Sequence, residues 1–195
     1  MRLAIFDFDG TITTKDSLIE FIHYAVGPLC FFVGFTYLAP VLILYLLKIL
    51  PNWKAKEITL TYFFKGWSAD KFQKIANDYS QKKLPFIVKK SALEKITWHQ
   101  AQGDKIIVVS ASLENYLSTW CQTYHMELMA TQLEIENGQL TGKLNTPNCY
   151  GKEKIKRLKE KYRWEDFEFI YAYGDSEGDK ALKEISQEFH FRTFK

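Results

Sequence analysis

The sequence lacks the cysteine pattern of a disulfide-stabilised protein. Its three cysteines, Cys30, Cys121 and Cys149, are odd in number and widely separated, and no CxxC pair occurs. This pattern favours free thiols in a reducing compartment. The four histidines show no HExxH or paired spacing, so they are poor candidates for metal ligands.

A strong net charge is also missing. The formal charge of +3 over 195 residues is too small to indicate nucleic-acid binding. The N-terminus "MRLAIFDFDG" reaches Asp7 and Asp9 before an apolar signal region could form, so we expect no secretory signal and a cytoplasmic location. An apolar fraction of 47% with 16% aromatic residues predicts instead a densely packed globular protein.

Short apolar runs alternate with helical patterns along most of the chain. Residues 3–8, 106–109 and 167–173 are typical of buried strands, and helical spacing lies between them at 91–102, 113–124 and 152–162. This alternation predicts a parallel sheet with helices on both faces, in which ligands bind at the carboxyl ends of the strands. The residues at the three strand ends are polar: Asp7 and Asp9, Ser110, and Asp175 and Asp179.

Two segments depart from this alternation. In "LEIENGQLTGKL", Asn137-Gly138 between alternating apolar residues predicts a β-hairpin, which we expect beside the main sheet. Residues 14–85 are mostly helical in pattern and include the most apolar part of the chain. We therefore expect a core formed by residues 1–14 and 86–195, with residues 15–85 inserted as a helical cap.

Residues 24–47 contain no charged side chain and are long enough for a transmembrane helix. A single crossing would separate Asp7 from Ser110 and Asp175, and the segment is broken by Gly27, Pro28, Gly34 and Pro40. A pair of shorter helices is favoured, with three alternatives for its environment: a buried cap core, a membrane-inserted hairpin that returns to its own side, or an oligomer interface. The lysines that follow, Lys48, Lys54 and Lys56, suit a cytoplasmic membrane surface or a solvated loop.

The stretch "DFDGT" suggests phosphoryl chemistry. A carboxylate such as Asp7 can attack phosphorus and form an aspartyl phosphate, which divides a slow hydrolysis into two displacements. Because an anion then approaches an anion, a cation is required, and Mg²⁺ held by carboxylates such as Asp175 suits the task. If the chain turns at Gly10, Asp9 is free to protonate the leaving oxygen and later to activate water.

Other polar groups can bind the phosphate. The N–H of Gly10 can point at a phosphate oxygen, and the hydroxyl of Ser110 can donate to another. A lysine is needed to offset charge in the transition state, and "CYGKEKIKRL" offers Lys152 and Lys154 at the start of a helix.

The ordered set of DxDGT, a strand-end serine, a helix-start lysine and GDxxxD resembles the haloacid dehalogenase-like superfamily, in its phosphoserine-phosphatase-like branch with a helical cap after the first motif. The resemblance implies a Rossmann-like core, Mg²⁺ dependence and phosphomonoester hydrolysis through a phosphoaspartate. By position, Asp7 resembles the nucleophile and a metal ligand. Asp9 resembles the general acid/base, and its backbone carbonyl resembles a further metal ligand. Ser110 resembles the phosphate-binding hydroxyl. Asp175 resembles the remaining metal carboxylate, and Asp179 resembles the acid that supports Asp175.

The resemblance leaves the lysine open. Phosphoserine phosphatases match Lys152, whereas lipid-directed relatives with a CxGxxK pattern match Lys154, and we prefer Lys152 slightly. Asp16 stands where phosphoserine phosphatases use a glutamate to hold the substrate's amine, but the cap contains no arginine to hold a carboxylate. Gly178 replaces their usual asparagine.

The apolar cap resembles that of phosphatidylglycerophosphatase-like members of the branch. We therefore expect the substrate to be a small or amphiphilic phosphomonoester, such as a lipid-headgroup phosphate. We also expect the apolar cap to associate with the cytoplasmic surface of a membrane. Two alternatives remain open: a phosphotransferase of the same fold, and a catalytically weak membrane-associated binding module.

Overall fold

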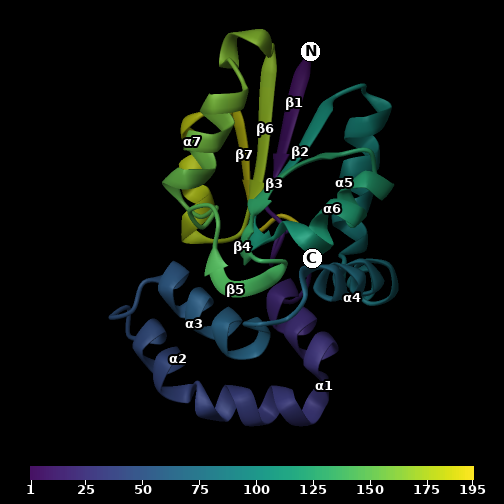
Figure 1. The fold of residues 1–195 in the computed structure, drawn as a ribbon. Helices are drawn as coiled ribbons and strands as arrows, with labels where there is room; N and C mark the ends of the chain where they lie inside the picture. The colour runs from purple at the N-terminus through teal and green to yellow at the C-terminus, as the bar shows by residue number, and fades with distance from the viewer.

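A five-stranded parallel sheet forms the centre of the computed structural model, which describes all residues 1–195 (Figure 1). The strand order is β3-β2-β1-β6-β7. Their bounds are β1 (Arg2–Phe6), β2 (Lys105–Leu113), β3 (Glu127–Thr131), β6 (Phe169–Gly174) and β7 (Glu188–Phe191). The expected Rossmann-like α/β class is confirmed, and two short outer strands, β3 and β7, join the three that the sequence pattern predicts.

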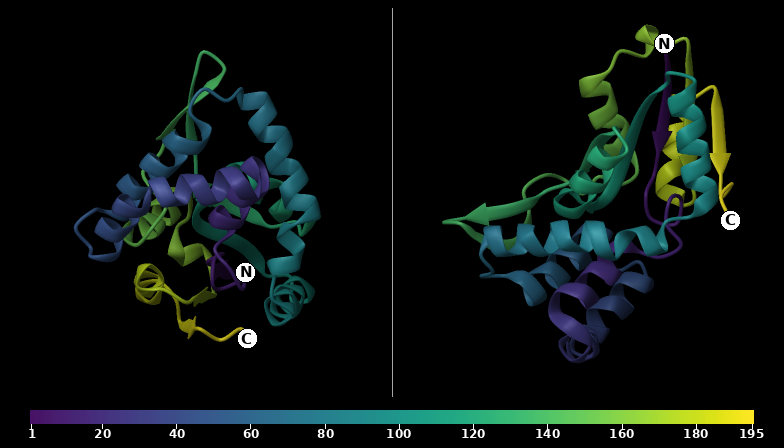
Figure 2. Two further views of the ribbon diagram at one scale, coloured as in Figure 1. Left: turned by 90° about the horizontal axis from the view of Figure 1, so that it is seen from below. Right: turned by 90° about the vertical axis from the view of Figure 1, so that its right-hand side faces the viewer.

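Helices cover both faces of this sheet (Figures 1 and 2). Helices α5 (Lys90–Ala101) and α6 (Glu114–Thr123) pack on one face, and α7 (Lys152–Lys161) and the 3-10 helix η3 (Glu177–Glu184) on the other. Successive residues of β1 alternate between the two layers: Ala4 and Phe6 join the α5–α6 cluster, whereas Leu3 and Ile5 join the α7–η3 cluster. Burial on both faces explains why this strand is an unbroken apolar run.

The sheet order reverses at β1, which places the strand ends at a topological switch point. Phe6 pairs with Val108 of β2 on one side and with Tyr173 of β6 on the other. The strand ends at Phe6, earlier than expected, and fully buried Phe8 turns into the core against Trp120. Strand β2 continues past the expected end, and its register with β3 shifts in the region of Ser110.

The helices α1 (Ser17–Tyr37), α2 (Ala39–Leu46), α3 (Asn52–Phe64) and α4 (Ala69–Lys82) follow β1 and lie beyond the carboxyl ends of the strands (Figure 1). A short 3-10 helix, η1 (Leu84–Ile87), leads from α4 towards α5, and η2 (Trp164–Asp166) precedes β6. One apolar cluster contains Phe21 and Phe64 of these helices together with Phe6 of the sheet. Because packing is continuous, the division at residues 15–85 stays a prediction.

The predicted hairpin is present and is separate from the main sheet. Strands β4 (Leu133–Glu136) and β5 (Gln139–Leu144) are antiparallel, and Asn137 and Gly138 both have positive φ, 50° and 74°, as a two-residue turn of this kind requires. They form a sheet of their own that extends away from the main sheet (Figure 2). Helix α3 approaches so closely that a Cβ on Gly142 would lie 2.3 Å from the Cα of Thr61.

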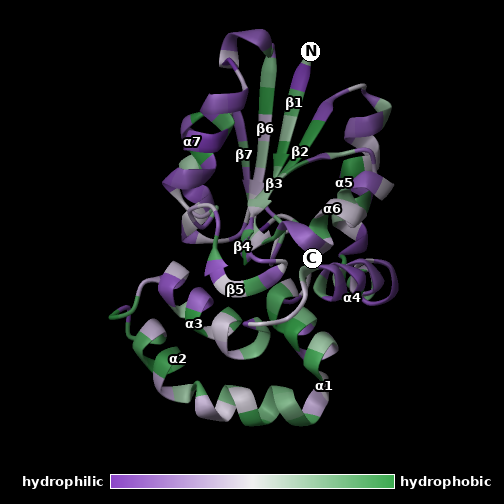
Figure 3. Cartoon of the chain, in the orientation of Figure 1, coloured by the Kyte–Doolittle hydropathy of each residue, from purple (hydrophilic) through white to green (hydrophobic).

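The apolar segment 24–47 is broken, as expected, but it is mostly exposed. Helix α1 is interrupted at Gly27, whose φ is 79°, and α2 contains no buried residue. The exposed fractions of Leu29 and Leu46 are 76% and 74%, so the alternative of a buried cap core is wrong. Figure 3 shows the green, hydrophobic helices α1 and α2 at the end of the molecule remote from the sheet. Counted as one helix, the 21 residues of α1 are long and apolar enough to cross a membrane, and only 22% of its most apolar window is buried. The break at Gly27, however, divides α1 into two shorter helices.

Candidate active site

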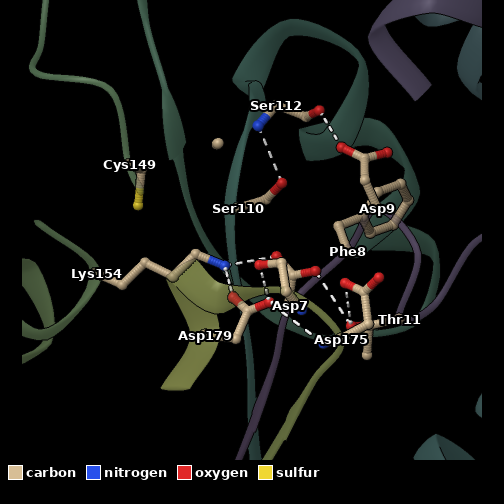
Figure 4. Close-up of polar contacts among 12 residues, drawn as sticks. Asp7, Phe8, Asp9, Thr11, Ser110, Ser112, Cys149, Lys154, Asp175 and Asp179 are labelled. Atoms are coloured by element: carbon tan, nitrogen blue, oxygen red, sulfur yellow. Dashed lines mark hydrogen bonds and ion pairs between the residues drawn. The ribbon is translucent and has the colours of Figure 1, made fainter. Parts of the chain in front are cut away.

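Asp7 occupies the end of β1, where its carboxylate is held from two sides (Figure 4). Its Oδ1 accepts a hydrogen bond from Nζ of Lys154 at 2.5 Å, and its Oδ2 accepts one from Oγ1 of Thr11 at 3.1 Å. Burial raises the pKa of Asp7 to about 7 because it removes water from the carboxylate, and the Lys154 charge offsets only part of this effect. A cation bound beside Asp7 would favour its ionised form.

Lys154 is the lysine that reaches the site. Its side chain is 2% exposed, and its Nζ also donates to Oδ1 of Asp179 at 2.6 Å. Burial acts to lower the pKa of Lys154, but the two carboxylates outweigh it and keep the pKa above its ordinary value. Lys152, which the sequence slightly favoured, is exposed on the outer side of α7 and lines a surface cleft with Glu184. The structure therefore brings only one of the two candidates to Asp7.

Asp175, in the loop after β6, and Asp179, in the first turn of η3, approach Asp7. Ligand oxygens of the three carboxylates lie within 4.8 Å of one another. Asp179 accepts hydrogen bonds from the backbone N–H of Asp175 and of Ser176 and from the Ser176 hydroxyl, and it closes a capping box at the start of η3. Burial acts to raise the pKa of Asp179, but the charge of Lys154 and these hydrogen bonds hold it below its ordinary value. Asp179 is thus a fixed, ionised support.

The cluster fits a divalent cation. The carboxylate of Asp175 accepts only a long hydrogen bond, 3.5 Å, from Oγ1 of Thr11. Its pKa is raised by burial and by the charge of Asp179. A Cβ on Gly10 would lie 2.2 Å from Oδ2 of Asp175, so the backbone leaves room only for that carboxylate. One ammonium beside three carboxylates leaves negative charge uncompensated. All-oxygen donors with surplus negative charge suit Mg²⁺.

The N–H of Gly10, which the sequence offers as a phosphate-binding group, has a partner within the turn. It donates to Oγ1 of Thr13 at 3.3 Å, while the carbonyl of Gly10 accepts from Nζ of Lys89 at 2.5 Å. Both contacts lie within or beside the turn that follows β1, in which Gly10 has a positive φ of 79°. Gly10 therefore acts through its lack of a side chain beside Asp175.

Asp9 is partly buried, and its carboxylate points away from Asp7 towards Ser112 (Figure 4). Its Oδ1 accepts from the N–H of Ser17 at 2.7 Å, and its Oδ2 accepts from the hydroxyl of Ser112. Burial and the charge of Asp16 raise its pKa to about 6, against the opposing effect of the two serines. A carboxyl group with this pKa can both give and take a proton near neutral pH.

Ser110 is 1% exposed and lies in the same cluster (Figure 4). Its Oγ accepts from the N–H of Ser112 at 3.0 Å, which leaves its own proton available for a ligand. Sequence reasoning missed two other participants, Thr11 and Ser112. Thr11 could have been found from the sequence because it belongs to the "DGT" motif. Ser112 could not, because its contact with Asp9 joins residues 103 positions apart and no local pattern indicates it.

Two cap residues lie on the Asp9 side of the site. Asp16 is exposed and caps α1 by accepting from the N–H groups of Leu18 and Ile19, a structural role that the sequence did not suggest. Lys56 of α3 donates to the carbonyl of Ala111 at 2.7 Å and to Oδ1 of Asn148 at 3.0 Å. Burial lowers its pKa to about 8, although the charges of Asp9 and Asp16 act in the opposite direction.

Comparison with known protein families identifies the chain. The family model described as haloacid dehalogenase-like hydrolase matches residues 4–183. The chain belongs to the haloacid dehalogenase-like hydrolases. The residues matched include the whole carboxylate cluster, from Asp7 to Asp179, and the complete set of cap helices.

Relatives of this haloacid dehalogenase-like hydrolase include phosphatases. Protein CicA of Caulobacter vibrioides is 31% identical over 195 residues, which cover 99% of the chain and 86% of CicA. A probable phosphatase of Mycobacterium tuberculosis is 30% identical over 128 residues, 64% of the chain and 44% of that protein. A probable phosphoserine phosphatase from Vibrio cholerae shares the fold, with a TM-score of 0.73 and 17% sequence identity. The match covers 97% of the chain described here and 55% of the Vibrio cholerae protein. The haloacid dehalogenase-like hydrolase described here is a phosphatase.

Proposed function

We propose that this phosphatase hydrolyses phosphomonoesters through a phosphoaspartate on Asp7 and depends on Mg²⁺. The observation that carries the proposal is the setting of Asp7, which is buried between Lys154 and Thr11 and beside Asp175 at the switch point of the sheet. Asp7, Asp175 and the carbonyl of Asp9 would hold Mg²⁺. When bound, it supplies positive charge that binds the phosphate and favours the ionised form of Asp7.

In the first step, an oxygen of Asp7 attacks phosphorus, and the bond from phosphorus to the ester oxygen breaks. Asp9 donates its proton to the departing oxygen, which leaves as an alcohol. The pKa of about 6 keeps a fraction of Asp9 protonated near neutral pH. Lys154 and the Ser110 hydroxyl stabilise the negative charge on the phosphoryl oxygens.

In the second step, water attacks the same phosphorus and transfers a proton to Asp9. The bond between phosphorus and Asp7 breaks, so inorganic phosphate leaves and both carboxyl groups return to their starting states. Because Asp9 is fixed by Ser17 and Ser112, it stays in place between the two steps.

The substrate proposal is a small or amphiphilic phosphate ester whose remainder lies on the cap side. Lys56 contacts Ala111, the residue between Ser110 and Ser112, so its ammonium lies at the edge of the site. Two of its N–H groups are used and a third is available for an anionic group of the substrate. This lysine supplies the cap cation that the absent arginine would otherwise provide.

A cleft of about 680 Å³ beside the active site supports an amphiphilic ester as the substrate. Pro51 and Trp53 line it from the cap side, and Leu144 and Tyr150 line it from the core side. None of the active-site carboxylates lines this cleft, but Asn148, which does, accepts a hydrogen bond from Lys56. We propose that the apolar part of a substrate, such as a lipid with a phosphate headgroup, lies there, and that the enzyme works in the cytoplasm at the inner face of a membrane.

Hydrolysis of p-nitrophenyl phosphate tests the reaction. Wild-type protein should release phosphate with Mg²⁺, lose activity with EDTA and regain it when Mg²⁺ is restored, and Asp7→Asn should be inactive. Beryllofluoride should form an adduct with the wild type but not with Asp7→Asn. Activity in EDTA, or an active Asp7→Asn variant, would contradict the mechanism, and transfer of phosphate to an alcohol without free phosphate would indicate a phosphotransferase.

A further inference from the structure

The end of the cap carries an exposed apolar surface, which we call the cap tip. It is formed by the second half of α1, by α2 and by the loop that follows α2 (Figures 1 and 3). Its most exposed members, between 64% and 76%, are Leu29, Phe32, Tyr37, Leu46, Leu47 and Ile49. Contiguous apolar surfaces of this kind are unusual on monomeric soluble proteins and mark interaction sites.

The segment that forms the cap tip contains no acidic side chain. No Asp, Glu, Lys or Arg occurs from residue 21 to residue 47, and the next charged residues are Lys48 and Lys54. The lysine after them, Lys56, is turned into the active site instead. The first acid after Glu20 is Glu57, a partner of Lys54. Lys48 forms no salt bridge. An apolar surface with a cationic edge complements a bilayer that contains anionic lipids.

Aromatic side chains border the same surface. Tyr37 stacks on Tyr62 with ring centroids 5.3 Å apart, and Tyr45 and Trp53 are 38% and 48% exposed. Tyrosine and tryptophan favour the boundary between headgroups and acyl chains, where one end of the ring is apolar and the other is wet.

The helices are too short to span a bilayer. The break at Gly27 separates residues 28–37 from the start of α1, and ten helical residues measure about 15 Å, against a hydrocarbon core of about 30 Å. Helix α2 has eight residues. The chain enters and leaves the cap tip on the side of the active site (Figure 1), which is the geometry of a surface-bound hairpin.

We propose that the cap tip docks on an anionic lipid bilayer, with its aliphatic side chains below the headgroups and Lys48 and Lys54 among them. A second copy of the chain is a poorer occupant because a symmetric contact uses the same patch on both sides, and this patch offers no acid to pair with Lys48. The docking itself is independent of catalysis, whereas its use in presenting an amphiphilic ester to the site rests on the proposed function. The cleft that contains Trp53 adjoins this surface.

Cosedimentation of the full chain with lipid vesicles tests the proposal. The wild type should bind vesicles of phosphatidylcholine and phosphatidylglycerol more strongly than pure phosphatidylcholine vesicles, and less strongly at high salt. Leu46→Glu on α2 and Leu29→Glu on α1 should each weaken binding at least about tenfold, because each places a charge in the apolar layer. Phe86→Glu is the matched control, since Phe86 is 84% exposed but lies in η1, and it should bind as the wild type does.

Further measurements separate docking from folding, catalysis and self-association. The glutamate variants should still hydrolyse p-nitrophenyl phosphate, and Asp7→Asn should bind vesicles normally, so inactivity and failure to dock are distinguishable. A wild type that remains in the supernatant with both vesicle types overturns the proposal, as does equal binding by Leu46→Glu. A dimer in sedimentation velocity without lipid, abolished by Leu46→Glu, together with no vesicle binding, would assign the surface to a second copy.

Discussion

Nζ of Lys154 lies 2.5 Å from Oδ1 of Asp7, and this contact joins residues 147 positions apart. The same ammonium group contacts Asp179, so one lysine fixes both the proposed nucleophile and the loop that carries Asp175. The active site is therefore a single charge network rather than a set of independent side chains.

Replacing Lys154 should disable this network. In Lys154→Met the two carboxylates lose their shared cation, and the phosphoryl transition state loses a donor. We expect kcat to fall by about 10²–10³, the usual effect of removing one such donor. Lys152→Met is the matched control two residues away on the exposed side of the helix, and its kcat for p-nitrophenyl phosphate should be unchanged. If Lys152→Met lost activity and Lys154→Met kept it, Lys152 would be the lysine that stabilises the phosphoryl transition state.

A methyl group at position 10 should displace Asp175. In Gly10→Ala the new Cβ would lie 2.2 Å from Oδ2 of Asp175, and we expect at least tenfold weaker Mg²⁺ affinity, measured as the Mg²⁺ concentration for half-maximal activity. Gly103→Ala is the control, because Gly103 also has a positive φ, 70°, but has no heavy atom within 4 Å of the new Cβ. Both variants should lose roughly 1–2 kcal/mol of stability through backbone strain; similar Mg²⁺ dependence in the two would exclude the steric explanation.

Gly178 and Tyr150 should be energetically coupled. A Cβ on Gly178 would lie 2.5 Å from Cε2 of Tyr150, so Gly178→Asn must push that ring into the neighbouring cleft. We expect a higher KM for an amphiphilic phosphate ester in Gly178→Asn, with kcat for p-nitrophenyl phosphate retained. In a double-mutant cycle, Gly178→Asn on a Tyr150→Ala background should change KM less. Additive effects of the two substitutions would show that the ring is not displaced.

Buried His99 should make the protein less stable in acid. His99 is fully buried between Asp104 at 2.7 Å and the hydroxyl of Tyr173 at 2.9 Å, and burial lowers its pKa from 6.5 although Asp104 acts to raise it. As the pH falls through 6.5, the unfolded chain takes up a proton that the native histidine does not. The free energy of unfolding should therefore fall with decreasing pH, by at most about 1.4 kcal/mol per pH unit from this group.

Urea denaturation on both sides of that pH measures this effect. His99→Gln should reduce the pH dependence, whatever its effect on stability at neutral pH. His125→Asn is the control, because His125 is exposed at a φ of 52°, which asparagine tolerates. A pH dependence that is the same in the wild type and in His99→Gln would contradict the assignment.

The sequence predicts the parts of the site that depend on local order. An apolar run followed by "DFDGT", and another followed by "GDSEGD", place carboxylates at strand ends, and parallel strands bring their carboxyl ends to one edge. The short outer strands β3 and β7 were missed because they are four or five residues long and only partly buried, so they lack a continuous apolar run. The hairpin turn was predictable from Asn137-Gly138, but its place against α3 was not, since that depends on contacts distant in sequence.

The choice of lysine depended on packing. Lys154 and Leu158 are four residues apart and share the buried side of α7, whereas Lys152 lies about 160° around the helix from Lys154. Helical periodicity allows either lysine to border the apolar positions. Only the position of Asp179, set by the loop after β6, decides which ammonium is paired in the interior.

The fold class, the carboxylates at the strand ends and the interruption of the apolar segment can all be predicted from the amino-acid pattern, because each follows from local order and from the geometry of parallel sheets. Which residues of the apolar segment are covered by other parts of the chain depends instead on tertiary packing. An exposed helix and a buried one can have the same composition, and exposure depends on whether another part of the chain packs against them. Leu38 is covered and Leu46 is not, although both lie in one uncharged run.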